Sequence, residues 1–156
     1  MKFIKSISTS IFTLLLCTAC ESDLEQVTYS SENAIPSTLS SLNDSYILES
    51  KNASQEAFTL TWSYPDLGYQ ASVINALEMD VKDKNFANKV ILASSKTDLS
   101  HTITVSDLNS KIMTLLKVYE IETAPIGIEF RISSSISAAA DTLYSNIVST
   151  TITPRS

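Results

Sequence analysis

Aromatic and acidic side chains meet in one short stretch of the chain in a way that suits ligand binding. Trp62, Tyr64, Asp66 and Tyr69 all fall between residues 62 and 69. Sugar rings stack on exposed aromatic faces, and carboxylate or amide groups beside them hold the hydroxyls. These residue types therefore predict a candidate carbohydrate contact.

Trp62 has a competing interpretation within the same stretch. Phe58, Leu60 and Trp62 alternate with polar residues, and this period of two places their large side chains on one face of a half-buried strand. We therefore expect Trp62 in the core, which leaves Tyr64 and Tyr69 as the candidate glycan-binding residues. Both flank a turn, and tyrosines at strand ends are also common in β-sandwiches, so this second interpretation stays open.

Catalytic and metal sites need side chains that are scarce in this sequence. It has one histidine, His101, and two cysteines, Cys17 and Cys20. A metal cage needs several ligands at fixed spacing, and nucleophilic catalysis needs a nucleophile beside a base. We expect His101 to be a plain surface histidine, and we predict no enzyme activity, no catalytic or metal-binding residue and no cofactor.

Paired acids occur as Glu120 with Glu122 and as Asp80 with Asp83. Glycoside hydrolysis requires two acids that face a sugar cleft, and nothing in these pairs distinguishes them from a solvated acidic surface. Arg131 is opposite in parity to the apolar residues around it, so we expect a cross-strand ion pair with an acid.

Composition limits the classes of protein to which the chain can belong. Its 156 residues match one ordinary domain, and 11 basic against 17 acidic side chains give a formal charge of −6. The basic residues are scattered, whereas a nucleic-acid binder needs them clustered, so no nucleic-acid partner is expected. With 26 Ser and 16 Thr against 2 Gly, the composition favours β-strands.

The first twenty residues have the layout of a bacterial export signal. Lys2 and Lys5 precede an apolar run over 7–16, which is too short to span a bilayer, and two cysteines follow at once. Small Thr18 and Ala19 stand before Cys20, as in a lipobox. We therefore predict a lipoprotein signal peptide over 1–19 and lipidation of Cys20, against the alternative of a secretory signal with an incidental cysteine.

Three carboxylates follow the cysteine, on Glu21, Asp23 and Glu25. This cluster resembles the surface-export signal of Bacteroidetes lipoproteins, and a solvated tether is the alternative. The chain then stays polar through Leu42, with little periodicity. We expect an acidic and polar linker over 20–42 and a folded domain over 43–156.

Alternating apolar residues predict an all-β fold, an immunoglobulin-like or fibronectin-III-like sandwich of about seven strands. The expected strands lie near 46–48, 58–62, 73–81, 89–93, 102–105, 126–132 and 146–153. Residues 80–88 are charged enough to form a turn region, in which Phe86 is the apolar anchor. One short helix is expected after Ser106, because Ser106 can cap it and Asp107 suits its positive end.

Several short segments, taken in their order along the chain, resemble the N-terminal domain of SusE-type outer-membrane lipoproteins of Bacteroidetes. These lipoproteins serve uptake of starch and other glycans. The segments are the stretch ending in Cys20, 60–63 (LTWS) with Pro65, 77–80 (LEMD) leading to Asn85-Phe86, 107–109 (DLN), 129–132 (EFRI), 145–148 (SNIV) and Thr153-Pro154. The resemblance implies an immunoglobulin-like, membrane-proximal spacer on the cell surface.

The same resemblance implies a noncatalytic accessory of polysaccharide binding and import. Its partners would be the outer membrane through the lipid anchor, a TonB-dependent transporter, glycan-binding lipoproteins and polysaccharide. Glycan binding in full-length members lies in further C-terminal domains, so we expect this domain to bind glycans weakly or not at all. The alternative is an immunoglobulin-like protein-interaction lipoprotein with no glycan role.

Overall fold

The structure is a computed structural model that describes residues 33–137 and 140–155. Its elements are β1 (Ser45–Ile47), the 3-10 helix η2 (Ser50–Asn52), β2 (Glu56–Thr61), β3 (Ile74–Val81), β4 (Val90–Ser95), β5 (Ser100–Thr104), α1 (Val105–Val118), β6 (Ile126–Ser135), β7 (Leu143–Tyr144) and β8 (Val148–Thr153). The predicted signal peptide, Cys20 and the acidic cluster of Glu21, Asp23 and Glu25 lie outside the described residues.

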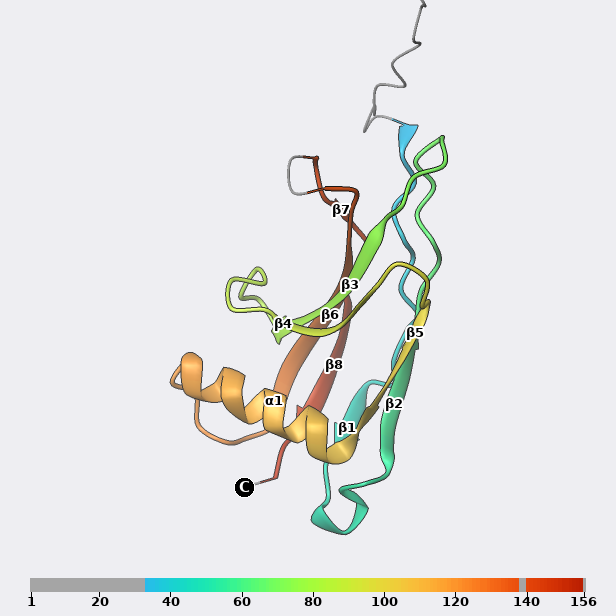
Figure 1. The fold of residues 1–156 in the computed structure, drawn as a ribbon. Coiled ribbons are helices and arrows are strands. Elements are labelled where there is room, and N and C mark those ends of the chain that lie inside the picture. The colour runs from blue at the N-terminus through green and yellow to red at the C-terminus, as the bar shows by residue number, and fades with distance from the viewer. Residues whose placement is uncertain (1–32, 138–139, 156) are drawn as a thin grey trace, which may run out of the picture.

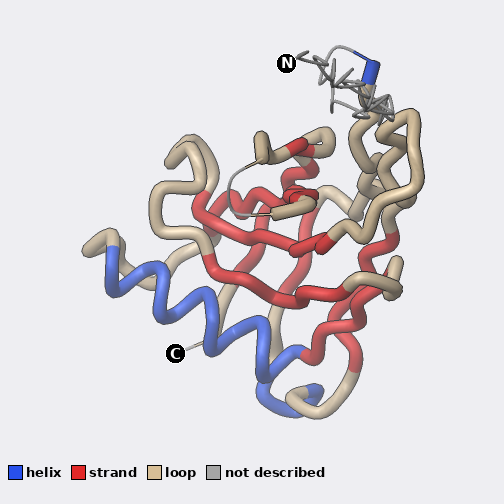
Figure 2. The backbone as a smooth tube through the Cα atoms, turned by 45° about the horizontal axis from the view of Figure 1, so that its top comes forward, coloured by secondary structure: helices blue, strands red, loops and turns tan. Residues whose placement is uncertain are grey.

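The eight described strands form two sheets (Figure 1). Six strands make one sheet in the order β1-β8-β6-β3-β4, with β7 paired to β6, and β2 and β5 make the other. Strand β1 runs parallel to β8, whereas the other pairs are antiparallel. Figures 1 and 2 show α1 at one end of the sheets and the β2–β3 loop at the other. The predicted β-rich architecture with one α-helix is confirmed, and the short strand β7 is an addition to it.

The core lies between the two sheets and is built by strand alternation. Five inward side chains of β3 and β6 are fully buried: Leu77, Met79, Ile128, Phe130 and Ile132. Phe58 of β2 meets Phe130 edge to face, with ring centroids 5.7 Å apart. Each such side chain stabilises the folded state by about 1.5 to 3 kcal/mol when it is buried. The alternation in the sequence places these side chains on the inner faces, where they hold the two sheets together.

The turn between β3 and β4 has an unusual backbone. Asp83, Asn85 and Phe86 have positive φ angles of 63°, 53° and 54°. A bulky residue such as Phe86 adopts this conformation at an energetic cost. Burial of its ring to 6 % exposure, 4.0 Å from the Arg131 guanidinium carbon, offsets that cost. The predicted anchoring role of Phe86 is confirmed.

Helix α1 begins earlier than the sequence predicted. Thr104, the last residue of β5, is extended and its Oγ1 accepts a hydrogen bond from the Asp107 backbone N–H at 3.2 Å. Thr104 therefore caps the helix, and the expected capping role of Ser106 is wrong. The cause is that β5 runs directly into α1 without a loop, which puts Ser106 inside the first turn, where its carbonyl accepts a bond from the Ser110 hydroxyl.

Part of the stretch expected as a linker packs against the end of β2. Ile35 bridges to Asp66 and Leu39 bridges to Trp62. Leu39 is buried in the core, and the Asn146 side chain binds both its N–H and its carbonyl. The packing thus begins before residue 43, because Leu39 supplies an apolar side chain that the core accepts.

In the part of the chain that the structure describes, no helix is long and apolar enough to cross a membrane.

Candidate functional site

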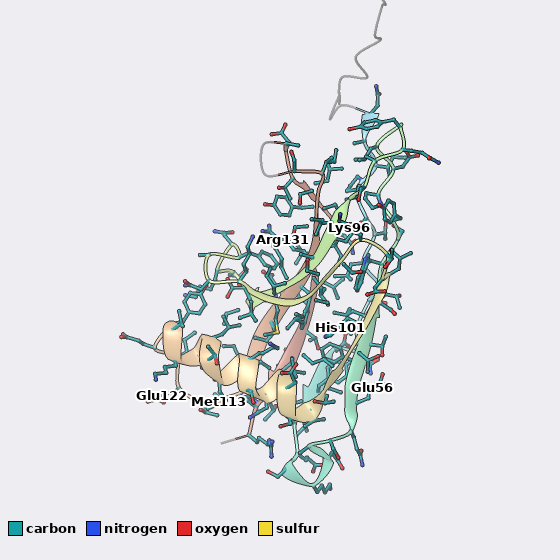
Figure 3. The ribbon with its side chains drawn as sticks, viewed as in Figure 1. Glu56, Lys96, His101, Met113, Glu122 and Arg131 are labelled. Carbon is teal, nitrogen blue, oxygen red and sulfur yellow. The ribbon has the colours of Figure 1, made fainter. Side chains whose placement is uncertain are left out.

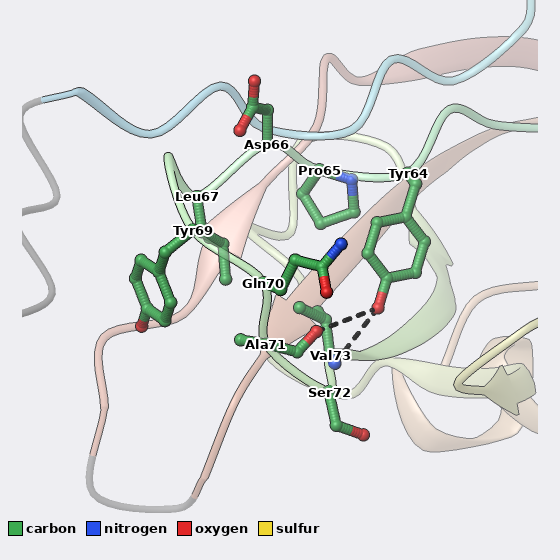
Figure 4. Close-up of a pocket in the computed structure, with 9 residues that line it drawn as sticks. All are labelled: Tyr64, Pro65, Asp66, Leu67, Tyr69, Gln70, Ala71, Ser72 and Val73. Atoms are coloured by element: carbon green, nitrogen blue, oxygen red, sulfur yellow. Dashed lines mark hydrogen bonds between the residues drawn. The ribbon is translucent and has the colours of Figure 1, made fainter. Parts of the chain in front are cut away.

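The loop between β2 and β3 encloses a hollow of about 560 Å³ (Figure 4). Its lining comes from one stretch of the chain and consists of Tyr64, Pro65, Asp66, Leu67, Tyr69, Gln70, Ala71, Ser72 and Val73. Both candidate glycan-binding tyrosines are therefore brought to one pocket. The β2–β3 loop that lines the hollow lies at the end of the molecule opposite α1 (Figure 1).

Two side chains shape this loop from within. The Tyr64 hydroxyl accepts a hydrogen bond from the Val73 N–H at 3.2 Å and donates to the Ala71 carbonyl at 3.5 Å. Asp66 Oδ1 accepts from the N–H of Gly68, whose φ of 74° suits glycine. The Tyr64 hydroxyl and Asp66 Oδ1 thus hold the loop in shape.

The two tyrosines do not form one flat platform. Figure 4 shows Tyr64 and Tyr69 on opposite sides of the hollow, with Gln70 between them. Tyr64 is 42 % exposed and Tyr69 is half-buried. The lining can therefore offer one ring edge, the Gln70 amide and the second oxygen of Asp66 to a ligand, which is a small set for a sugar.

The residues that line the hollow do not support hydrolytic chemistry. Asp66 is its one carboxylate, and glycoside hydrolysis needs two. The lining also lacks a basic side chain that would activate a nucleophile.

Trp62 lies in the core, as its parity predicted. It is 6 % exposed and belongs to the cluster that includes Leu60 and Phe130. Its indole Nε1 is buried and has no hydrogen-bond partner among the described residues. A sugar cannot stack on a ring in this position, so the carbohydrate interpretation of Trp62 is wrong.

His101 is not the plain surface histidine that the sequence predicted. It is half-buried and pairs in register with Leu60 across the two-stranded sheet. Its side chain shares the face of buried Ile103, two residues along the strand, and its Nε2 is buried without a partner among the described residues. The parity that His101 shares with Ile103 would have predicted this. The described residues hold no group of three or more metal-ligating His, Cys, Asp or Glu side chains.

The predicted acid pairs differ in their exposure to solvent. Glu120 and Glu122 are exposed beyond the end of α1. Asp80 is fully buried: it accepts hydrogen bonds from the Tyr119 hydroxyl at 2.9 Å and the Asn88 N–H at 3.1 Å. Its carboxylate ties the β3–β4 turn to the end of α1, so the description of a solvated acidic surface is wrong for Asp80.

A cluster of one acid and two cations occupies the outer face of the six-stranded sheet. The Glu78 carboxylate, 2 % exposed, is 2.7 Å from Lys89 Nζ and 2.7 Å from Arg131 Nε. Glu78 and Arg131 are directly opposite on β3 and β6, so the predicted cross-strand ion pair is confirmed. The Arg131 guanidinium lies between the rings of Phe86 and Tyr144, at 4.0 and 3.9 Å.

The two cations decide the charge state of Glu78. Burial on its own raises the pKa of this carboxyl, but the hydrogen bonds from Lys89 and Arg131 outweigh burial and hold the pKa below its ordinary value of 4.5. Sequence reasoning predicted the partner of Arg131 only as "an acid" and missed the burial of Glu78. The parity of Glu78 assigns it to the outer face of β3, and no pattern shows that the β3–β4 turn and Tyr144 cover that face.

Comparison with known proteins gives one match. The sequence matches the family described as SusE outer membrane protein over residues 22–133, which is more than half of the chain. No curated protein and no solved structure matches it significantly. The matched region runs from the acidic cluster through Glu78 and Arg131, so the predicted resemblance is confirmed. This chain belongs to the SusE outer membrane protein family.

Proposed function

We propose that the protein is a noncatalytic lipoprotein of the cell surface that serves the binding and import of starch or another polysaccharide. The family match over residues 22–133 is the observation that carries the proposal. Lipidation of Cys20 would hold the chain on the outer membrane, and the acids at 21, 23 and 25 would direct it to the outer leaflet.

Within this role, the described domain acts as a membrane-proximal spacer with an immunoglobulin-like arrangement of strands. Two sheets that pack face to face and a first strand β1 parallel to the last strand β8 support that arrangement. A spacer needs rigidity more than a ligand site, and the packed core provides it. The spacer connects the lipid anchor to the partners of the uptake system, a TonB-dependent transporter and glycan-binding lipoproteins.

The spacer role predicts that the domain by itself contributes little glycan affinity. Trp62 is buried, and the hydroxyl of Tyr64 is used by its own loop. We expect residues 20–156 to migrate without retardation through native gels that contain amylopectin or pullulan. Strong retardation that disappears in Tyr64→Ala or Tyr69→Ala would instead make the hollow a glycan-binding site.

The accessory role is tested separately in cells. A deletion of the gene should slow growth on the polysaccharide whose transporter the protein accompanies, and growth on the matching monosaccharide should not change. Crosslinking on intact cells should join the protein to a TonB-dependent transporter. Normal growth on every polysaccharide and no crosslink to a transporter would favour the alternative, a protein-interaction lipoprotein without a glycan role.

A further inference from the structure

Two segments near the ends of the described chain lie side by side. Residues 39–48, called the entry segment, include β1, and residues 146–153, called the exit segment, include β8. Strand β1 pairs with β8 in parallel, so both segments run in the same direction along the sheet. Figure 1 shows the described chain beginning at one end of the molecule and finishing at the other, beyond β8. A pull on the two ends would therefore slide the two segments past each other.

Hydrogen bonds join the entry segment to the exit segment before β1 and within it. The Asn146 side chain binds the N–H and the carbonyl of Leu39, at 2.8 and 3.1 Å. Further along, Thr150 Oγ1 donates to the Asn43 carbonyl at 2.7 Å, and the pairing of β1 with β8 continues the contact. Both side-chain contacts join residues that are 107 positions apart, so the two segments keep one register.

Core side chains lie behind these hydrogen bonds. Leu39 and Leu48 of the entry segment and Ile152 of the exit segment are buried in the core. The ring of Tyr46 packs on Phe58 of β2, with ring centroids 4.9 Å apart. A hydrogen bond in a low-dielectric interior is electrostatically stronger than one in water. The two segments are therefore held both by hydrogen bonds and by the core.

The chain is fastened again on either side of the paired segments. Beyond β8, the Arg155 N–H donates to Asn109 Oδ1 of α1 at 2.9 Å, and Asn109 Nδ2 donates to the Arg155 carbonyl at 3.2 Å. Before the entry segment, Ile35 exchanges two backbone hydrogen bonds with Asp66, at 2.7 and 2.9 Å. A pull on either end meets these contacts first and then reaches the paired segments.

The direction of a pull decides how many bonds resist it together. When two paired strands are pulled lengthwise in opposite directions, all the bonds between them are stretched at once. When they are pulled apart crosswise from one end, the bonds break one after another. Forced unfolding is governed by the rate of unfolding, and a barrier at which several bonds must break together is higher. The parallel pairing of β1 with β8 gives the lengthwise case.

We propose that the entry and exit segments form a mechanical clamp, which keeps the domain folded when the chain is pulled at its two ends. Its use in the cell rests on the proposed function, because lipidation of Cys20 would hold the entry side at the membrane. A transporter or glycan-binding lipoprotein held at the far end would pull on the exit side. The clamp itself is a property of the fold and can be measured without lipid or glycan.

Pulling single molecules in two directions tests the clamp. The chain from residue 20, made without lipid, carries one DNA handle on Cys20 and one on Ser156→Cys, so that the clamp is pulled lengthwise. A second form combines Cys20→Ser, Lys51→Cys and Ser156→Cys and is pulled crosswise, because Lys51 lies in η2, just after β1. In optical tweezers at one loading rate, the lengthwise form should unfold at about twice the force of the crosswise form.

A substitution within the clamp separates mechanical resistance from general stability. Thr150→Val keeps the shape of the side chain and removes the hydrogen bond to Asn43. It should lower the lengthwise unfolding force and leave the crosswise force unchanged, because crosswise pulling breaks the bonds singly. Thr102→Val is the matched control: it removes a hydroxyl contact with Thr59 on β5, the strand of His101 in Figure 3, and should change neither force. Circular dichroism checks that both variants fold.

Three outcomes would overturn the proposal. Equal unfolding forces in the two directions would show that the parallel pairing gives no added resistance. A first step at low force that releases only the residues before η2 would show that the entry segment leaves the exit segment without resisting. An equal loss of force in both directions for Thr150→Val would show ordinary stabilisation instead of a clamp. None of these readouts involves lipidation or polysaccharide, so the proposed function and this inference can fail separately.

Discussion

At the scale of single residues, the molecule places the buried carboxylate of Glu78 between two cations. A buried carboxylate without partners is strongly destabilising, and removing one member of a buried pair costs more than the pair contributes. Glu78 avoids this cost because each of its oxygens faces one cation. Phe86 and Tyr144 fix the guanidinium of Arg131 in the plane that reaches Glu78.

The Glu78→Gln variant should be destabilised by roughly 3 kcal/mol at pH 7, since it leaves Arg131 and Lys89 without their anion. The folded pKa of Glu78 is below 4.5. The stability that ionised Glu78 contributes to the wild type is therefore fully present above pH 4.5 and is lost as the pH falls through the folded pKa. Urea unfolding between pH 3 and pH 7 measures both effects. The difference in unfolding free energy between wild type and Glu78→Gln should become smaller in acid.

Glu122→Gln is the matched control for this experiment, because Glu122 is exposed. It should change the unfolding free energy by less than about 0.5 kcal/mol at any pH. A gap between wild type and Glu78→Gln that stays constant down to pH 3 would show that Glu78 does not titrate as a paired carboxylate.

Trp62→Ala tests the core assignment. Deleting a buried indole should cost about 3 to 5 kcal/mol, because the cavity that it leaves relaxes only in part. Thermal unfolding followed by circular dichroism measures the loss, and Tyr69→Ala on the loop should cost less. The fluorescence of Trp62 in the wild type should have its maximum at short wavelength and should resist quenching by iodide. Free quenching by iodide would place the ring in solvent.

At the scale of elements, the passage from β5 to α1 depends on one hydroxyl. Thr104 is at once the last residue of a strand and the N-cap of a helix. We expect Thr104→Ala to cost about 1 kcal/mol and Ser106→Ala about half of that or less. Chemical denaturation of both variants distinguishes the two capping assignments, and a larger cost for Ser106→Ala would reverse them.

At the scale of the whole molecule, the proposed lipid anchor at Cys20 can be tested apart from the folded domain. Cys20→Ala should release the protein from membranes into soluble fractions, because each buried methylene of an acyl chain contributes about 0.8 kcal/mol to anchoring. Fractionation and labelling with radioactive palmitate measure the change. Labelling that persists in the variant would assign the lipid to another residue, and Cys17→Ala is the control that should keep both label and membrane attachment.

The sequence alone determined most of the strands and the residues of the core. Strands with one polar and one buried face show their alternation directly, as 126–132 does, and the observed β6 and its buried residues follow it. Family membership was also readable, because it depends on the order of short segments. The break between strands was found at 64–68, and Tyr64 and Tyr69 flank it.

Only the tertiary structure decided which polar residues are buried. Glu78 and Asp80 have the parity of an exposed face, yet the β3–β4 turn, Tyr144 and the end of α1 cover them. These covering segments are distant in sequence, and no local period records them. The parallel pairing of β1 with β8 depends on strand order for the same reason: a sequence shows which residues can pair in a sheet, and long-range packing decides which strands become neighbours.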